Sequence, residues 1–210
     1  MYKLIILDFD GTIGDTNKII TTTMQSTLRE LGLPMRSAEE CRKTIGLPLK
    51  GCFEALLPLS DSQLDNCADT YRRIFDEYNR TMKVDVFPGV MEKIEQWHAD
   101  GAIITLASSR GHASLAAFVS QMGLDRYVSY ILGADDVEIA KPHPYPVLKT
   151  MRHFGIAPED TLVVGDMSFD ILMGNRAGCH TCGVTYGNGT VEELQAAGAD
   201  QICDSFLSIR

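Results

Sequence analysis

Short apolar runs alternate with segments of helical periodicity along most of the chain. Three of these runs, at 4–7, 102–107 and 161–164, are typical of strands buried on both faces of a sheet. Further strands are predicted near 130–134 and 181–186, and helices separate the strands. Strands that alternate with helices predict an α/β fold with a mostly parallel, Rossmann-like sheet in three layers.

The segment that follows the first predicted strand has a different pattern. Apolar residues recur at three- and four-residue steps over 17–31 and 62–81, which predicts two amphipathic helices. Two shorter helices are predicted between them, and the first of these begins with Ser37 and Glu40 at the spacing of a capping box. No stretch of this segment has the pattern of a strand.

This helical segment divides the chain into two predicted domains. We expect a catalytic α/β core formed by residues 1–15 and 83–210, and an all-helical cap formed by residues 16–82. Because the insertion directly follows the first strand, the cap is expected to cover the carboxyl end of that strand. An element in that place is suited to closing over a site and excluding water.

Polar side chains follow three of the predicted strands. Asp8 and Asp10 come after the first strand, and Ser108 comes after the second. Asp166 and Asp170 follow the strand at 161–164, at the start of a helix, so both can face one crevice. Ligands of parallel sheets bind at the carboxyl ends of the strands, so we expect these side chains to form one site.

Each of these residues also has an ordinary structural interpretation. Asp8 and Asp10 would suit an acidic turn, and Ser108 and Asp166 would suit the caps of the following helices. Lys141, in a proline-rich loop, would be an exposed lysine. Two neighbouring carboxylates repel each other unless a cation or a lysine neutralises them, so their conjunction with a lysine favours a Mg²⁺ site with a nucleophilic carboxylate.

Together these pieces resemble the motifs of the haloacid dehalogenase superfamily of phosphotransferases. The matching residues are Asp8-Phe9-Asp10-Gly11-Thr12 for the first motif, Ser108 for the second, Lys141 for the third, and Gly165-Asp166-x-x-x-Asp170 for the fourth. The resemblance covers the whole chain and implies the strand order 5-4-1-2-3, with a helical cap inserted after the first motif. The surroundings of the first motif and of the cap turn at 45–49 are similar to those of phosphoglycolate phosphatases.

The resemblance implies a Mg²⁺-dependent phosphatase of a small phosphomonoester, with 2-phosphoglycolate as the first candidate. Asp8 would form an aspartyl-phosphate, Asp10 would act as general acid and base, and Ser108 and Lys141 would stabilise the phosphoryl oxygens. The expected metal ligands are Asp8, Asp10 through its backbone carbonyl, and Asp166, with Asp170 behind them. Further candidates for substrate binding are Gly11, Thr12 and Ser109 in the core and Arg42, Lys43 and Lys50 in the cap.

Other functions share most of these features. An inorganic pyrophosphatase or a β-phosphoglucomutase of the same superfamily would carry the same core motifs. A non-catalytic phosphate-binding module would use the same carboxylates without turnover. A phospho-aspartate receiver would be about half as long and would lack the helical insertion.

Composition and charge indicate which classes of binding partner the chain can have. Apolar residues make up 45% of the chain and charged residues 22%, which is typical of globular proteins, and the formal charge is −9. This charge disfavours nucleic acids and anionic membranes, so we expect a small phosphorylated metabolite as the partner, no nucleic acid or membrane, and a monomer or homodimer. No apolar run is long enough to span a membrane, and we expect no signal peptide.

The cysteines indicate a reducing compartment. Six cysteines in a chain of this size are typical of cytosolic thiols, so a cytoplasmic location is expected. Cys179 and Cys182 have the spacing of a metal or redox knuckle, but no second pair accompanies them. Structural burial is therefore the favoured interpretation of this pair.

Overall fold

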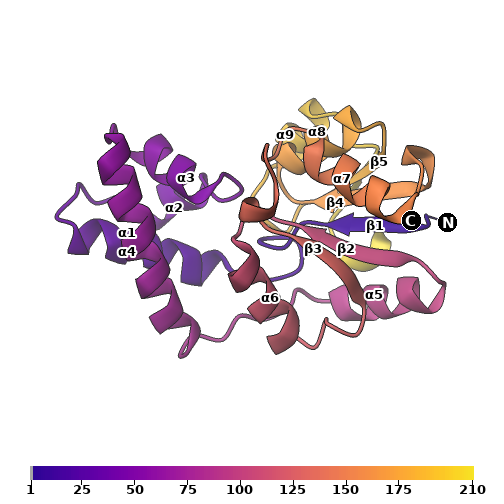
Figure 1. Cartoon of the computed structure of the whole chain (residues 1–210), viewed down its shortest axis with the longest axis horizontal. Coiled ribbons are helices and arrows are strands. Elements are labelled where there is room, and N and C mark those ends of the chain that lie inside the picture. The colour runs from indigo at the N-terminus through magenta and orange to yellow at the C-terminus, as the bar shows by residue number, and fades with distance from the viewer. Residues whose placement is uncertain (1) are drawn as a thin grey trace. The chain divides into compact units, whose positions relative to one another are not determined.

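The computed structural model describes residues 2–210, so residue 1 of the predicted core lies outside the described part of the chain. The chain forms two compact units, coloured along the sequence in Figure 1. One unit contains the residues up to Gly14 together with Val86–Arg210, and the other is Asp15–Asp85.

The first unit is built on a six-stranded sheet in which all registered neighbours are parallel. Its strands are β1 (Leu4–Leu7), β2 (Ile103–Ala107), β3 (Val128–Leu132), β4 (Thr161–Gly165), β5 (His180–Val184) and β6 (Gln201–Cys203). The order β3-β2-β1-β4-β5-β6 confirms the predicted order of the first five strands. The edge strand β6 was not predicted, because three partly buried residues are too few to show a pattern.

Helices cover both faces of this sheet. They are α5 (Val90–Ala99), α6 (His112–Gln121), α7 (Tyr145–Phe154), α8 (Ser168–Arg176) and α9 (Val191–Ala196), with short 3₁₀ turns η1 (Ala134–Asp136), η2 (Pro158–Asp160) and η3 (Phe206–Ser208). Figure 1 shows α7 and α8 on one side of the sheet and α5 and α6 on the other. The predicted three-layer α/β fold is confirmed.

The central strand β1 is buried because both of its faces are covered. Leu4 and Ile6 belong to a cluster that includes Val147 and Met151 of α7 and Met173 of α8, all fully or almost fully buried. Burying an aliphatic side chain contributes roughly 1.5–3 kcal/mol, so this cluster provides a rigid base for the residues that follow β1.

The second unit is helical throughout its regular structure. Its helices are α1 (Asn17–Glu30), α2 (Ala38–Arg42), α3 (Leu49–Leu56) and α4 (Asp61–Asn79). The capping box predicted at the start of α2 is present, since the Ser37 hydroxyl accepts from the Glu40 N–H and the Glu40 carboxylate accepts from the Ser37 N–H. Between α1 and α4, the hydroxyls of Ser26 and Tyr78 lie 2.9 Å apart in a hydrogen bond.

The chain crosses between the two units at neighbouring points of its path. In the α/β unit, Gly14 forms an antiparallel bridge with Val86. In the helical unit, the backbone N–H of Asp15 donates to the carbonyl of Asp85 at 2.9 Å. The segment that leads into the insertion and the segment that leads out of it are therefore paired by backbone contacts within each unit.

The six cysteines are free thiols. Cys179 and Cys182 are buried, and burial raises the pKa of the Cys179 thiol to about 12. These features agree with the structural interpretation of the pair. Among residues 2–210, no helix is both long enough and apolar enough to cross a lipid bilayer.

Candidate active site

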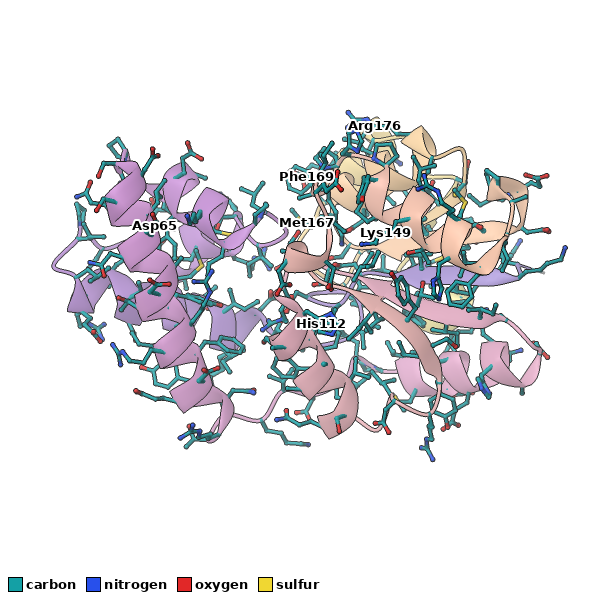
Figure 2. The ribbon with its side chains drawn as sticks, viewed as in Figure 1. Asp65, His112, Lys149, Met167, Phe169 and Arg176 are labelled. Carbon is teal, nitrogen blue, oxygen red and sulfur yellow. The ribbon has the colours of Figure 1, made fainter. Side chains whose placement is uncertain are left out.

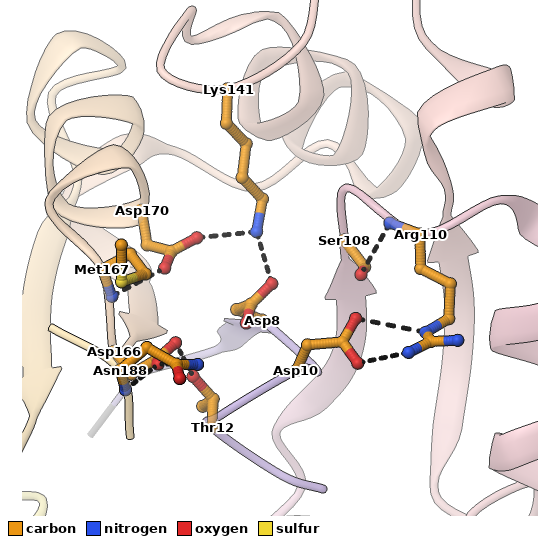
Figure 3. A network of polar contacts seen from close by, with 10 residues as sticks. All are labelled: Asp8, Asp10, Thr12, Ser108, Arg110, Lys141, Asp166, Met167, Asp170 and Asn188. Atoms are coloured by element: carbon orange, nitrogen blue, oxygen red, sulfur yellow. Dashed lines mark hydrogen bonds and ion pairs between the residues drawn. The ribbon is translucent and has the colours of Figure 1, made fainter. Parts of the chain in front are cut away.

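The site lies at the carboxyl ends of three adjacent strands, β2, β1 and β4 (Figure 3). Leu7 is in register with Leu106 on one side and with Val164 on the other, so the three strands end at the same level. The backbone N–H of Asp8 continues the ladder by donating to the carbonyl of Val164 at 2.9 Å. The predicted gathering of strand-end residues at one edge is therefore present.

Lys141 joins two carboxylates at the centre of the site. Its ammonium donates to Asp8 Oδ1 and to Asp170 Oδ1, both at 2.6 Å (Figure 3). The side chain of Lys141 is only 5% exposed, so it is not a surface lysine. Burial alone would lower the pKa of Lys141, but Asp170 and Asp8 outweigh it and raise the pKa above its usual range. The lysine is therefore a fixed positive charge between two acids.

One lysine does not balance the acidic groups around it. Burial raises the pKa of Asp8 well above its ordinary value; Lys141 opposes this effect, and the charges of Asp170 and Asp166 add to it. Burial, followed by the charge of Asp170, raises the pKa of Asp166 to about 7. These shifts mark a cluster with an excess of negative charge that a cation would relieve.

Asp166 is held by the turn after Asp8 and by the loop after β5. Its Oδ1 accepts from the Thr12 hydroxyl at 3.2 Å, and its Oδ2 accepts from the backbone N–H of Asn188 at 2.7 Å and from the Asn188 amide at 3.1 Å. Gly11 has a φ of +94°, and a Cβ at Gly11 or Gly187 would lie 2.2 or 2.3 Å from Asp166 Oδ2. Only glycine permits this close approach.

Thr12 and Gly11 were predicted to bind substrate. In the structure both residues contact the carboxylate of Asp166. Thr12 is fully buried and its hydroxyl is directed to Asp166, so this side chain supports the carboxylate. Asn188 and Gly187 were not predicted as site residues. A Gly-Asn-Gly run after a strand is typical of an ordinary turn, so the sequence contained no signal that it would reach the site.

The residues present fit a hard divalent cation such as Mg²⁺. Carboxylate oxygens of Asp8, Asp166 and Asp170 lie within 4.8 Å of one another, and oxygen donors are those that Mg²⁺ prefers. Both oxygens of Asp170 already accept hydrogen bonds, from Lys141 and from the Met167 N–H, which suits a place behind the direct ligands. The Oδ1 atom of Asn188 is buried and has no hydrogen-bond partner among residues 2–210.

The Mg²⁺ affinity of the metal-free protein should fall as the pH is lowered through about 7. The pKa of Asp166 lies near 7, and a metal must displace any proton on its carboxylate. The folded-state pKa is raised, so protonation stabilises the metal-free fold at low pH and this contribution is lost as the pH rises through about 7. Calorimetric titration at about pH 6 and about pH 8 should show weaker binding at the lower pH, with proton release; equal affinities would contradict this.

Asp10 faces a different partner from Asp8. Arg110 donates to both of its oxygens, from Nη2 to Oδ1 at 2.6 Å and from Nε to Oδ2 at 3.1 Å (Figure 3). The carboxylate of Asp10 is therefore outside the cluster of Asp8, Asp166 and Asp170. This arrangement is compatible with a metal contact through the backbone carbonyl of Asp10, which stays a prediction.

Two residues of the site do not serve as helix caps. The first helix after Ser108 has Gly111 at its N-cap, and the Ser108 hydroxyl accepts instead from the Arg110 N–H at 3.1 Å. The helix after Asp166 has Met167 at its N-cap, whose N–H donates to Asp170. Ser108 and Asp166 are thus both directed into the strand-end site.

A pocket lies beside these groups, and Ser108, Ser109 and Lys141 contribute to its lining. The lining also includes Ala134 of the turn η1. That turn is anchored by Asp136, whose carboxylate contacts His112 Nδ1 at 2.6 Å and whose carbonyl accepts from Lys149 at 2.6 Å. Figure 2 labels His112 and Lys149 among the side chains of this unit.

The three basic candidates of the predicted cap belong to the helical unit. Arg42, Lys43 and Lys50 are exposed there. Lys43 contacts Glu39 at 3.3 Å, and Lys50 forms an ion pair with Asp65, which is labelled in Figure 2. Their part in substrate binding stays a prediction.

A three-layer α/β fold with buried carboxylates and a buried lysine at the strand ends of its parallel sheet is typical of an enzyme whose carboxylates take part in the reaction. The family model described as haloacid dehalogenase-like hydrolase matches residues 5–184. The chain belongs to this family.

Relatives agree on the enzyme class. "Probable phosphatase IndB" of Dickeya dadantii is 35% identical, with all of this chain and 92% of that protein covered. "Pyrophosphatase PpaX" of Anoxybacillus flavithermus is 31% identical (87% and 83% covered), and "Phosphoglycolate phosphatase" of Salmonella typhi is 27% identical (96% and 88% covered). A haloacid dehalogenase-like protein from Bacteroides fragilis has a crystal structure with a TM-score of 0.93, 27% identity and 98% of each chain covered.

The superfamily and the enzyme class expected from the motifs are thereby confirmed, and the chain is a phosphatase of the haloacid dehalogenase superfamily. The interpretation as a non-catalytic binding module is correspondingly disfavoured.

Proposed function

We propose that this chain is a Mg²⁺-dependent phosphatase that hydrolyses a small phosphomonoester in two steps through an aspartyl-phosphate on Asp8. The observation that carries the proposal is the buried Asp8 carboxylate at the end of the central strand. Its Oδ1 is bonded to Lys141 at 2.6 Å, and no other hydrogen bond to this carboxylate occurs among the described residues. Oδ2 would therefore be the attacking atom.

In the first step, the Asp8 oxygen would form a bond to phosphorus as the bond from phosphorus to the leaving oxygen breaks. Asp10 would give its proton to that leaving oxygen. In the second step, Asp10 would take a proton from water, the water oxygen would bond to phosphorus, and the Asp8–phosphorus bond would break. The products are the alcohol, inorganic phosphate and the original two carboxyl groups.

Other residues of this chain would neutralise and orient the phosphoryl group. Lys141 contributes a positive charge beside Asp8, and Ser108 contributes a hydroxyl at the neighbouring strand end. Asp8 and Asp166, with the Asp10 backbone carbonyl, would hold Mg²⁺, and Asp170 would support them from behind. When bound, the metal supplies charge neutralisation and Lewis acidity at the phosphoryl oxygens.

The first candidate substrate is 2-phosphoglycolate, because the surroundings of the first motif are similar to those of phosphoglycolate phosphatases and a relative over nearly the whole chain bears that name. Pyrophosphate is the second candidate, because three relatives at 30–31% identity are named pyrophosphatases. Both substrates are small and carry a second anionic group.

A substrate panel tests the proposal. Phosphate release would be measured with and without Mg²⁺ from 2-phosphoglycolate, pyrophosphate, β-glucose 1-phosphate and several sugar phosphates, with isomerisation of β-glucose 1-phosphate followed in parallel. Mg²⁺-dependent preference for 2-phosphoglycolate supports the first candidate. Preference for pyrophosphate or clean isomerisation overturns the substrate and keeps the core chemistry, and absence of turnover on every compound contradicts the proposal.

Asp10→Asn should slow turnover of alkyl phosphates by roughly 10²–10⁴-fold while leaving Mg²⁺ binding largely intact, because the amide keeps the shape of the side chain and its backbone carbonyl but cannot transfer the proton. Steady-state kinetics and Mg²⁺ titration check the two halves of this prediction. A variant with a near-normal rate would show that Asp10 is not the acid and base.

A further inference from the structure

The site contains a second cation with a buried side chain, Arg110. Its guanidinium makes a two-point contact with Asp10, at 2.6 and 3.1 Å, and the two side chains are only 8% and 13% exposed. Both oxygens of the Asp10 carboxylate are occupied by N–H donors of one planar group. Such a contact fixes the plane of a carboxylate as well as its position.

Arg110 is itself held from several directions. Its Nη1 donates to the Ser114 hydroxyl at 3.0 Å, and its guanidinium carbon lies 4.9 Å from the centre of the Phe118 ring. Its backbone carbonyl accepts from the N–H of Ala134 at 2.8 Å. Helix α6 and the segment after β3 therefore both restrain the arginine, which makes it a rigid support for Asp10.

The main chain of Arg110 also touches the site. Its N–H donates to the Ser108 hydroxyl at 3.1 Å, so one residue orients both Ser108 and Asp10. These two side chains come from the ends of neighbouring strands, β2 and β1. Arg110 thus couples the position of the candidate proton donor to the candidate phosphoryl-binding hydroxyl.

We propose that Arg110 is a positioning residue that acts through Asp10, holding the Asp10 carboxyl group in the orientation from which it serves the leaving group and the attacking water. This inference rests on the proposed function, because it takes proton transfer by Asp10 as given. Lysine could not replace the arginine, since an ammonium lacks the planar pair of donors that matches both carboxylate oxygens.

The first test compares leaving groups. An alkoxide needs a proton as it departs, whereas p-nitrophenolate is stable without one, so only the alkyl phosphate depends on a well-placed acid. Arg110→Ala should lower kcat/KM roughly 10- to 100-fold for 2-phosphoglycolate, or for the best alkyl phosphate of the panel, but less than about threefold for p-nitrophenyl phosphate. Arg110→Lys should recover little of the loss. Equal losses on both substrates would overturn the proposal.

The second test is a double-mutant cycle. If Arg110 acts only through Asp10, adding Arg110→Ala to Asp10→Asn should change kcat/KM less than about twofold. An unchanged large effect in that background would show that Arg110 acts directly on substrate or on the fold, which overturns the inference. A near-normal rate of Asp10→Asn alone would instead refute the role of Asp10 in the proposed function.

Two further variants keep the test decisive if Arg110→Ala does not fold. Ser114→Ala removes only the Nη1 contact, so it should reproduce the selective loss on alkyl phosphates at smaller size. Arg126→Ala is the matched control, because Arg126 is an exposed arginine that faces Glu95 at 3.9 Å away from the site, and its kinetics should match the wild type. If Arg126→Ala also lost kcat/KM selectively on alkyl phosphates, the assignment would be overturned.

Discussion

Asp8→Asn should abolish phosphate release from every substrate of the panel, the largest effect expected of any substitution in this chain. The amide has nearly the size of the carboxylate but lacks its negative charge, so it cannot form the bond to phosphorus. The fold should persist, because the change removes one of the buried acids that repel each other and leaves Lys141 its contact with Asp170.

Acid quenching after incubation with radiolabelled substrate separates this mechanism from direct attack by water. The wild-type protein should carry label on Asp8, and the variant should carry none. Asp125→Asn, on an exposed aspartate, is the control and should be labelled as the wild type is. Turnover by the Asp8 variant at a measurable fraction of the normal rate would contradict the nucleophilic role.

Lys141→Ala should cause the largest loss of stability. It leaves Asp8 and Asp170 buried without their shared cation, and removing one partner of a buried ion pair costs about 3–5 kcal/mol of the free energy of unfolding. Chemical denaturation of the metal-free proteins measures this loss. Activity should fall as well, because the positive charge beside the nucleophile is missing.

The pH dependence of this variant gives a further check. Without the lysine, the pKa of Asp8 is raised further above that of the unfolded chain, so the folded state binds more protons and its stability falls as the pH rises. Mg²⁺ should restore part of the loss at high pH. Lys149→Ala is the control, since Lys149, which lies on α7 and is labelled in Figure 2, donates to the backbone carbonyl of Asp136 and forms no ion pair among residues 2–210. A Lys141 variant as stable as this control would contradict the prediction.

The fold was predictable where one signal dominated. The runs at 4–7 and 161–164 form strands buried on both faces, and the periodic segments 17–31 and 62–81 form helices that end within two residues of the prediction. The strand order followed from the family resemblance, since periodicity alone does not rank strands in a sheet. Strand β6 was not predicted because it is short and half-buried.

The site was predictable where its residues follow strands directly. Asp8, Ser108 and Asp166 belong to this group, and the register of the sheet alone brings them together. Arg110 also follows β2, but its contribution depends on how far its long side chain reaches, and that of Asn188 depends on the path of the loop after β5; the local pattern encodes neither. Their roles are defined by the hydrogen bonds that they donate to Asp10 and Asp166.

The pairing of the chain where the insertion leaves and returns, through Gly14 with Val86 and Asp15 with Asp85, has an evolutionary consequence. The ends of the inserted segment are already adjacent, and lengthening a closed loop costs only about 0.6 kcal/mol for each doubling of its length. Descendants of one ancestral core could therefore exchange, enlarge or lose the segment between these points without rebuilding the sheet. Diversification of substrates would then proceed by changing an accessory module while the chemistry of the strand ends stays the same.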